Sequence, residues 1–550
     1  MVSVALVGMA GPALAQVPPL PDVRTPSVFP ATPNPYTPDS PSDYEAPWPA
    51  ASPVQPGGFN FPYGAVDSPS PDPAPGWTIQ PSLSLQILAT DNYYQTRHDR
   101  RSEFVTTLTP GILVTADTAR IRGVVAYEPA LELHAYGNGD NGIYHNLNGQ
   151  VLVTAIPETL FLDLRGSAYV QPAGGGYAAY GPTETSGRNQ VQTSSFQLSP
   201  YLVRRFGGLA TMQVGYAFQS VTEDTRDTSG VFLTPSGQPY YSDQSFTAHE
   251  FYAVVRTGEN FGRLAMEARG ISTDYNGSGV LDGAYRRIAA VEARYAINRL
   301  VAILGEIGYE EQKYNGIPPF HISEPVWSAG VRLSFSPDSF ITARYGRHDG
   351  FNSARLDAVL SVGGRTRIFA NYSESLTTSA QRSVDLLSTT TLDELGNPVD
   401  AITGAPSVLP FSNSLLGIQS GLMRVRSGSA SISQNWDRDT FTLTFLREER
   451  SPVSIEPGTS AARQSGTSGS ISWAHILTPD TTAIGFLQYG SFDSPAYGNG
   501  DVYTIGASLV TELMPGLAAT VQLTTSSRSD DTSGGRSLQN TVIAGLRKTF

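Results

Sequence analysis

Acidic and basic residues two positions apart are the groups in this sequence whose types and spacing could do chemistry. Glu267 precedes Arg269, and Glu292 precedes Arg294, in the same way. Residues at i and i+2 lie on the same side of a β-strand. Such residues could pair with neighbouring strands into a rigid ladder, or could present charge to a solute that passes a polar surface. Both interpretations require strands to position them.

Signatures of catalysis and of metal binding are missing from the sequence. The seven histidines are scattered, with no HExxH, GxSxG or GxxxxGKS motif, and the absence of cysteine excludes disulfides and thiolate metal sites. The stretches NGDNG and DYNGSG gather oxygen atoms that could bind calcium, although Asn, Asp and Gly are also the usual residues of turns. The sequence therefore predicts no enzyme, no cofactor and no metal, but a Ser, His and Asp brought together by folding would leave no local signature.

The composition favours a chain rich in turns and aromatic residues and poor in charge. Its 550 residues include 54 Gly, 26 Tyr and 23 Phe, and 15% are charged, against roughly 25% in soluble domains. The formal net charge is -13 and the pI is about 5.1. A nucleic-acid partner is not expected, because such proteins carry a basic face.

Two N-terminal segments are expected to lie outside the folded domain. Residues 1–15 are apolar and end in Ala13-Leu14-Ala15, as a signal peptide with its cleavage site would, although no Lys or Arg precedes the apolar run. A short buried helix is the alternative. Residues 16–76 are dominated by proline, as in PATPNPYTPDSPSDYEAPWP, and predict a disordered periplasmic linker. Its aromatic residues could instead bind a partner.

From Trp77 onward the sequence alternates between apolar and polar residues. In WTIQPSLSLQILA the apolar side contains Trp77, Ile79, Leu83, Leu85 and Ile87, and IRGVVAYEPALELHA and LFLDLRGSAYV repeat the pattern. Period two over ten or more residues is typical of a strand with one apolar and one polar face. No stretch as long as a membrane-spanning helix is apolar throughout, and no long helical period is evident.

The connections between these strands alternate between short turns and long loops. Short TADTAR, IPET and RFGG are interleaved with long stretches such as TDNYYQTRHDRRSE, DYNGSG and GRHDGFN. This alternation is expected of antiparallel strands that cross a bilayer up and down. We predict an all-β fold: a closed antiparallel transmembrane β-barrel over residues 77–550, with about 22 strands or alternatively 18–20 or 24. In hydrocarbon every backbone group must be paired, so the last strand should pair with the first.

The polar face of the predicted barrel should line its lumen, because a charge on the lipid side is penalised. The predicted lumen-lining residues are Arg122, Glu128, Glu132, Asp163, Arg165, Glu267, Arg269, Glu292, Arg294, Glu306, Arg332, Arg344 and Asp357. Phe550 ends the chain and should meet Trp77 at the periplasmic rim, with Lys548 beside them. The longest connection runs over about residues 375–424, and within it the segment TTTLDELGNPVDAITGAPSVLPFSNSLLG, residues 389–417, is the best candidate for a loop that constricts the lumen.

Several stretches resemble a known family. These are PSLSLQILATDNYY, RRSEFVTTLTPGILVTADTARIRGVVAYEPALELHAY and NYSESLTTS. They are similar to the outer-membrane β-barrel porin family that is often encoded with exopolysaccharide or capsule synthesis genes in Gram-negative bacteria. A strand that ends on Phe550 also resembles the signal by which the barrel assembly machinery selects its substrates. The resemblance implies an outer-membrane location, lipid as surroundings, and polysaccharide and periplasmic export proteins as partners.

Three functions are compatible with these observations. The first is a conduit for export of an exopolysaccharide or capsular polysaccharide, for which the family resemblance supplies the cargo. The second is a general diffusion porin for small hydrophilic solutes. The third is a membrane-anchored surface or scaffold protein that acts through its loops. A plugged transporter is disfavoured, because residues 16–76 lack the apolar residues of a folded plug.

Overall fold

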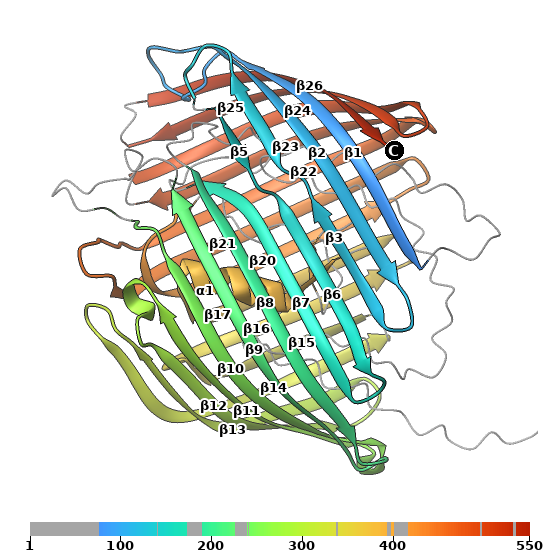
Figure 1. Ribbon diagram of the computed structural model, residues 1–550, viewed down its shortest axis with the longest axis vertical. Coiled ribbons are helices and arrows are strands. Elements are labelled where there is room, and N and C mark those ends of the chain that lie inside the picture. The colour runs from blue at the N-terminus through green and yellow to red at the C-terminus, as the bar shows by residue number, and fades with distance from the viewer. Residues whose placement is uncertain are drawn as a thin grey trace, which may run out of the picture.

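Antiparallel strands form nearly all of the described part of the protein (Figure 1). The computed structural model describes residues 76–139, 141–172, 190–225, 239, 241–336, 339–392, 398–400, 416–494, 498–531 and 535–550. The predicted signal peptide over residues 1–15 and residues 16–75 of the proline-rich segment lie outside this part. The middle of the long 375–424 connection also lies outside it.

Each strand continues the period-two pattern of the sequence. Among the described residues the strands are β1 (Trp77–Thr90), β2 (Glu103–Asp117), β3 (Ile121–Tyr127), β4 (Ala130–His134), β5 (Gly142–Tyr144), β6 (Leu147–Ile156), β7 (Leu160–Pro172), β8 (Gln190–Arg205), β9 (Ala210–Thr225), β10 (Ser245–Thr257), β11 (Leu264–Gly277), β12 (Tyr285–Ala296), β13 (Val301–Tyr314), β14 (Phe320–Ser336), β15 (Ser339–His348), β16 (Phe351–Val362), β17 (Thr366–Thr377), β18 (Thr390–Leu392), β19 (Pro398–Asp400), β20 (Gly421–Asn435), β21 (Asp439–Ile455), β22 (Gln464–Thr478), β23 (Thr481–Ser494), β24 (Gly498–Met514), β25 (Leu517–Asp530) and β26 (Gly535–Thr549). The helical elements are α1 (Ser379–Thr389) and the short 3-10 helices η3 (Glu259–Phe261) and η4 (Gly279–Leu281).

The strands close into a barrel. Every strand of the large sheet pairs antiparallel with its neighbour, and β26 pairs with β1 from Ser82 opposite Thr549 to Thr90 opposite Thr541. The described part of this sheet has 24 strands, of which β3 with β4 and β5 with β6 each form one crossing, so that the chain makes 22 crossings. Strands β18 and β19 form a separate two-stranded sheet within the described residues. The predicted closed barrel of about 22 strands is confirmed.

A proline explains why one predicted strand is divided. The stretch IRGVVAYEPALELHA forms β3 and β4, which both pair with β2 and are separated by Glu128 and Pro129. Proline has no N–H to donate, so the ladder of hydrogen bonds is interrupted at this point. The polarity pattern continues through the break, and the two halves keep the same place in the wall.

The outer face of the barrel is apolar. Leu83, Leu85 and Ile87 of β1 alternate with buried or half-buried polar residues and are each more than two-fifths exposed. The same holds around the wall for Leu443, Phe445, Ile471, Leu487, Ile505, Leu523, Val542 and Leu546. A closed barrel with an apolar outer band is the form in which strands span the bacterial outer membrane. The protein is therefore an outer-membrane β-barrel.

Aromatic side chains border the apolar band on both sides. On the short-turn side Phe441 contacts Trp436 and Trp473, with ring centroids 5.5 and 6.0 Å apart. On the long-loop side Tyr489 contacts Tyr503 across β23 and β24, with centroids 4.7 Å apart. Rings of this kind favour the interface between hydrocarbon and headgroups. Together the two groups mark the thickness of the bilayer on this part of the wall.

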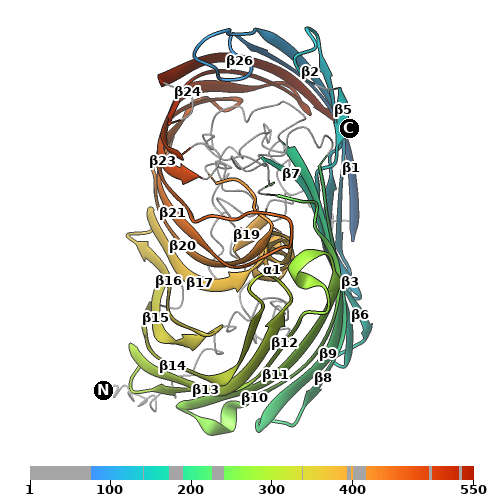
Figure 2. The same cartoon turned by 90° about the vertical axis from the view of Figure 1, so that its left-hand side faces the viewer.

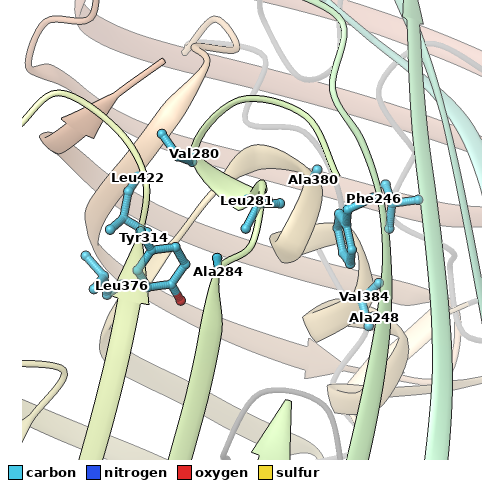
Figure 3. Packing of buried hydrophobic residues seen from close by; sticks show 11 residues of the cluster. Phe246, Ala248, Val280, Leu281, Ala284, Tyr314, Leu376, Ala380, Val384 and Leu422 are labelled. Carbon is cyan, nitrogen blue, oxygen red and sulfur yellow. The ribbon is translucent and has the colours of Figure 1, made fainter. Parts of the chain in front are cut away.

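The helix α1 lies inside the ring of strands, as Figure 2 shows. Ala380 and Val384 of this helix belong to a buried apolar cluster inside the barrel (Figure 3). The other members of the cluster are Val221, Phe246, Ala248, Val280, Leu281, Ala284, Tyr314, Leu376 and Leu422. Most of the cluster comes from the long-loop ends of the strands, so the apolar contacts of α1 lie near the long-loop side of the barrel.

No helix in the described ranges is long and apolar enough to cross a membrane.

Two expectations about the ends of strands are wrong in detail. The predicted long loop GRHDGFN is the two-residue turn Asp349-Gly350 between β15 and β16, with φ of 55° and 78°. An Asp-Gly pair suits a tight hairpin because both residues tolerate positive φ, so the alternation of short and long connections is not strict.

Phe550 donates its N–H to the carbonyl of Pro81 at 2.9 Å. The last strand thus ends opposite Pro81, four residues from Trp77 along β1.

Candidate functional site: the interior of the barrel

The helix α1 bridges the interior between walls that face each other. Arg382 forms an ion pair with Glu448 of β21, with Nη1···Oε1 at 2.6 Å and Nη2···Oε2 at 3.0 Å. From the other wall, Tyr169 of β7 is hydrogen-bonded to Ser383 at 2.9 Å. Arg165, also of β7, donates Nη1 to the carbonyl of Leu387 at 2.6 Å. Because it contacts both β7 and β21, the helix constricts the interior.

The start of α1 is fixed by reciprocal hydrogen bonds. The N–H of Gln381 donates to Oγ1 of Thr378 at 3.1 Å, and the N–H of Thr378 donates to Oε1 of Gln381 at 3.1 Å. This is a capping box, which satisfies two N–H groups that the first turn leaves without partners. The strand β17 ends at Thr377, so the cap sets the point at which the chain leaves the wall.

The wall between β16 and β17 opens where the chain turns inward. Pairing of these strands runs from Val362 opposite Thr366 only as far as Leu356 opposite Tyr372. Beyond that point β17 continues to pair with β20 up to Thr377. Arg424 of β20 fills the gap, since Nη2 donates to the carbonyl of Asn352 on β16 at 2.9 Å. The departure of β17 from its neighbour is therefore what carries α1 into the interior.

Arg382 does not hold Glu448 alone. Nε of Arg450 donates to Oε1 of the same carboxylate at 2.6 Å, and Glu448 is 1% exposed. A carboxylate with two arginine partners is strongly bound, because charge-assisted hydrogen bonds are the strongest that side chains form. These three side chains link α1, the long connection and β21. They form the polar part of the contact that attaches α1 to the wall, opposite the apolar cluster.

Asp385, on the same helix, is the titratable group of the constriction. Its carboxylate accepts a hydrogen bond from Oγ1 of Thr377 at 3.4 Å. Burial raises the pKa of Asp385 to about 7, because removal from water disfavours the charged form more than nearby Arg286 restores it. The helix therefore carries a group whose charge changes near neutral pH.

A second set of charges lies on the inner face of β10 to β16, and we call it the charge ladder. It contains eight predicted residues and three others: Arg256, Glu267, Arg269, Glu292, Arg294, Glu306, Arg332, Arg344, His348, Arg355 and Asp357. Each acidic member has an arginine partner. Glu267 is 2.6 Å from Arg256, Glu306 pairs with Arg269, Glu292 accepts both Nη groups of Arg344 at 2.7 and 2.8 Å, and Asp357 is 3.0 Å from Arg355.

Three of these ion pairs cross between strands, whereas Arg355 and Asp357 are two apart on β16. Glu267 does not pair with Arg269, and Glu292 does not pair with Arg294, among the ion pairs of the described residues. Glu306 of β13 reaches Arg269 of β11, two strands away, and also lies 3.4 Å from His348. Arg332 instead lies over the ring of Phe340, with Cζ 4.1 Å from the centroid. Arg294 is 1% exposed. Each acidic member is thus neutralised locally by an arginine, and six arginines against four acidic residues leave the ladder with two positive charges in excess.

The remaining predicted residues lie apart from the ladder. Asp163 and Arg165 on β7 pair with each other at 3.0 Å and face α1. Glu128, between β3 and β4, pairs with Arg547 of the last strand at 2.7 Å. Arg122 pairs with Asp117 at the short turn after β2, at 3.3 Å, and both side chains are exposed. Glu132 lies 4.0 Å from His134.

The inner face of β22 to β26 is different in kind, and we call it the neutral wall. Most of its buried polar side chains are uncharged: Gln464, Gln488, Thr504, Ser508, Thr520, Gln522, Thr524, Ser526, Ser537, Gln539 and Thr541. Their exposed neighbours on the same strands, such as Leu487, Ile505 and Leu523, form the outer band. Two buried arginines share this face, and each has an acidic partner: Arg528 pairs with Asp530 at 3.1 Å and Arg547 with Glu128 at 2.7 Å. In Figure 2 the neutral wall and the charge ladder lie in different halves of the barrel, with α1 between them.

Sequence reasoning missed α1 and its partners Glu448 and Arg450. The signal was present in TSAQ at 378–381, which has the pattern of a capping box, followed by Ala380, Val384 and Leu387 at i, i+4 and i+7. The helix is short, and such a period over eleven residues is easily overlooked inside a long polar connection. In the described residues no group of three or more acidic or histidine side chains could hold a metal ion.

Comparisons with known proteins find only distant structural likeness. No protein-family model matches the chain, and no characterised protein matches it by sequence. Among solved structures, the ferric-catecholate import receptor Fiu of E. coli K12 has 10% identity and a TM-score of 0.46, over 85% of this chain and 81% of that one. The FrpB iron transporter of Neisseria meningitidis has 8% identity and a TM-score of 0.47, over 86% and 81%.

A porin is also among the similar structures. OccK2 of Pseudomonas aeruginosa, solved in complex with glucuronate, has 9% identity and a TM-score of 0.33, over 86% of this chain and 98% of that one. These matches are too distant to bear on what passes through the barrel.

Proposed function

We propose that this outer-membrane barrel is a conduit for a secreted, hydroxyl-rich polysaccharide and that α1 sets the width of the path. The observation that carries the proposal is the chemistry of the inner face. The neutral wall offers hydroxyl and amide groups, and each acidic member of the charge ladder is neutralised by an arginine. Sugars form hydrogen bonds with such groups, whereas a strong field of one sign would suit ions.

The choice of a polymer as cargo rests on the family resemblance of the sequence. Within that proposal, polymer would come from periplasmic export proteins, and the C-terminal strand would be recognised during assembly of the barrel. A polymer needs a continuous path, so α1 is expected to move or to leave enough space beside it. To move, α1 would have to leave the apolar cluster and break both hydrogen bonds of the ion pair that Arg382 forms.

A diffusion porin for small hydrophilic solutes is the second candidate. The observation that favours it is the tight attachment of α1 to both walls, because a fixed helix would leave room for small solutes more readily than for a polymer. The interior gives no comparable support to the surface or scaffold alternative. A barrel that only anchors surface loops in the membrane would need neither the neutral wall nor α1.

A deletion that removes α1 without disturbing the wall can separate these candidates. Thr377 of β17 and Met423 of β20 are direct cross-strand partners. An Asn-Gly turn can therefore replace residues 378–422 and join the two strands as an ordinary hairpin. A matched control removes residues 401–412 from the same connection and keeps α1.

The experiment measures polysaccharide released by cells that lack the protein and by cells that carry the wild type, the hairpin variant or the control deletion. Export predicts no release without the protein, and release with all three barrels, highest with the hairpin variant. Unchanged release from cells without the protein would overturn the export function. If the hairpin variant then raises uptake of small sugars into proteoliposomes, the diffusion porin is the better description.

A further inference from the structure

The outer wall carries a group of arginines where lipid should be. We call it the outer arginine patch and define it as Arg424, Arg426, Arg447 and Arg463 with Glu374 and Glu449. Four arginines against two glutamates leave two positive charges in excess, although the whole chain has a net charge of -13. A basic patch on an acidic protein requires a reason.

The register of the strands places most of this patch on the lipid side. On β21 the residues Leu443, Phe445, Arg447 and Glu449 alternate along one face, and Leu443 and Phe445 are half exposed in the apolar band. Gly428 of β20 lies opposite Arg447, and Arg426 lies opposite Glu449. Cross-strand partners project from the same face of a sheet. Arg426 and Arg447 therefore point outward.

The patch lies at the long-loop edge of the hydrocarbon. On the short-turn side Asp439 accepts a hydrogen bond from Trp473, within the aromatic border. Arg447 comes eight residues later on the same strand, or about 26 Å along it at roughly 3.3 Å per residue. The tilt of the strands reduces this to about 20 Å in height, close to the apolar band of about 25 Å in such barrels. Arg447 is thus level with lipid headgroups.

The charges of the patch are not balanced within the protein. Glu449 is shared between Arg463 at 2.8 Å and Arg426 at 3.5 Å, and Glu374 between Arg424 at 2.7 Å and Arg426 at 3.2 Å. Arg447 is exposed and has no side-chain hydrogen bond or ion pair within the described ranges. A guanidinium beside hydrocarbon needs an anion, and its planar fork matches the oxygens of a phosphate.

We propose that the outer arginine patch binds the phosphate groups of an anionic lipid in the outer leaflet. The glutamates hold Arg426 and Arg463 in place, and Arg447 supplies the uncommitted donor. The apolar residues below the patch would contact the acyl chains of the same lipid, which a free phosphate ion could not do. The site is separate from the interior, and it does not depend on the proposed export function.

The test compares variants that lose equal charge on opposite sides of the membrane. The patch variant is R426Q/R447Q/R463Q, and its matched control is R120Q/R263Q/R299Q, in which three exposed arginines of the short turns are replaced. A single R447Q variant removes no ion pair of the protein, so its effect cannot come from a disturbed Glu449. Migration of the folded barrel on a gel before and after heating verifies that each variant is folded.

Binding of lipid A to the purified full chain in neutral detergent is titrated by native mass spectrometry, with dephosphorylated lipid A and inorganic phosphate as further probes. We expect R447Q to bind lipid A about fivefold more weakly and the patch variant, which loses three arginines, about a hundredfold more weakly, since each arginine near an anionic surface adds about 1 kcal/mol. The control should bind within a factor of two of the wild type.

Three results with lipid A and its dephosphorylated form would overturn the proposal. These are equal binding by the patch variant and the wild type, an equal loss in the control, or equal binding of dephosphorylated lipid A. Complete displacement of the lipid by inorganic phosphate would assign the patch to free phosphate instead of lipid. Persistence of lipid binding in excess phosphate supports the lipid assignment.

Discussion

Glu128 and Arg547 join the two ends of the barrel, with Oε1 of the glutamate 2.7 Å from Nη2 of the arginine. Arg547 belongs to the last strand, while Glu128 lies between β3 and β4. Nη2 of Arg547 also donates to Oγ of Ser82 on the first strand at 3.2 Å. One side chain thus fastens β26 to β1 and to the segment beyond β2. The closure of the barrel has an ionic contact in addition to its backbone ladder.

Replacement of Glu128 by Gln is expected to weaken this closure. Arg547 is 6% exposed in the folded chain, and a buried charge whose partner is removed costs about 3 kcal/mol. The urea concentration at which the folded band disappears from gels should therefore fall. The double variant E128Q/R547M should regain most of the loss, because it leaves no unpaired charge. An E128Q barrel as resistant as the wild type would show that closure depends on the backbone alone.

The ion pair between Arg382 and Glu448 is expected to hold the constriction. In R382M the helix loses both charge-assisted hydrogen bonds to β21 but keeps Ala380 and Val384 in the apolar cluster. We expect single-channel recordings to show a larger or more variable conductance than the wild type. R101M is the control, because Arg101 is exposed and, among the described residues, forms its one ion pair with Asp99 on a loop. Identical traces for R382M and the wild type would mean that apolar packing fixes α1.

The attachment of α1 is expected to weaken as pH rises. Burial raises the pKa of Asp385 from 3.8 to about 7 when the helix is docked. Between these two values the docked state binds more protons than the undocked state, so the stability of docking is complete below about pH 4 and declines as pH rises to about 7. The ratio of docked to undocked helix should change by at most about tenfold per pH unit.

Conductance measured from pH 4 to pH 8 tests this expectation. The wild type should conduct more at the higher pH, and D385N should give a nearly flat profile because its side chain has no charge to lose. A D385N profile as steep as that of the wild type would assign the pH dependence to another group.

The strands were predictable from the sequence because alternation is local. Leu83, Leu85 and Ile87 reveal the lipid face of β1 without knowledge of any other strand, and the pairing of β26 with β1 follows from the requirement that no edge remain in hydrocarbon. The turn at Asp349-Gly350 is the exception. Its Asp-Gly pair is a hairpin signal, but the flanking polar residues suggested a longer loop.

The partners of the interior charges could not be predicted in the same way. Glu306 meets Arg269 because β11, β12 and β13 are neighbours at a particular register and the side chains extend past the strand between them. One residue of slip would send either side chain to the other face. The position of α1 depends on where β17 leaves β16, which is a property of the closed wall and not of the helix sequence.

The pair of Glu292 and Arg344 offers a test of whether the charge ladder contacts the permeating solution. If it does, E292Q leaves Arg344 unbalanced and should shift the reversal potential in a KCl gradient toward anion selectivity. R344M leaves Glu292 unbalanced and should shift the potential in the opposite direction. E292Q/R344M restores neutrality and should behave like the wild type. Opposite shifts from two changes at one contact cannot arise from general loosening of the wall, which would move both variants in the same direction. The absence of a shift in all three folded variants would mean that this pair is sealed from the path, and that solutes pass along the neutral wall on the other side of α1.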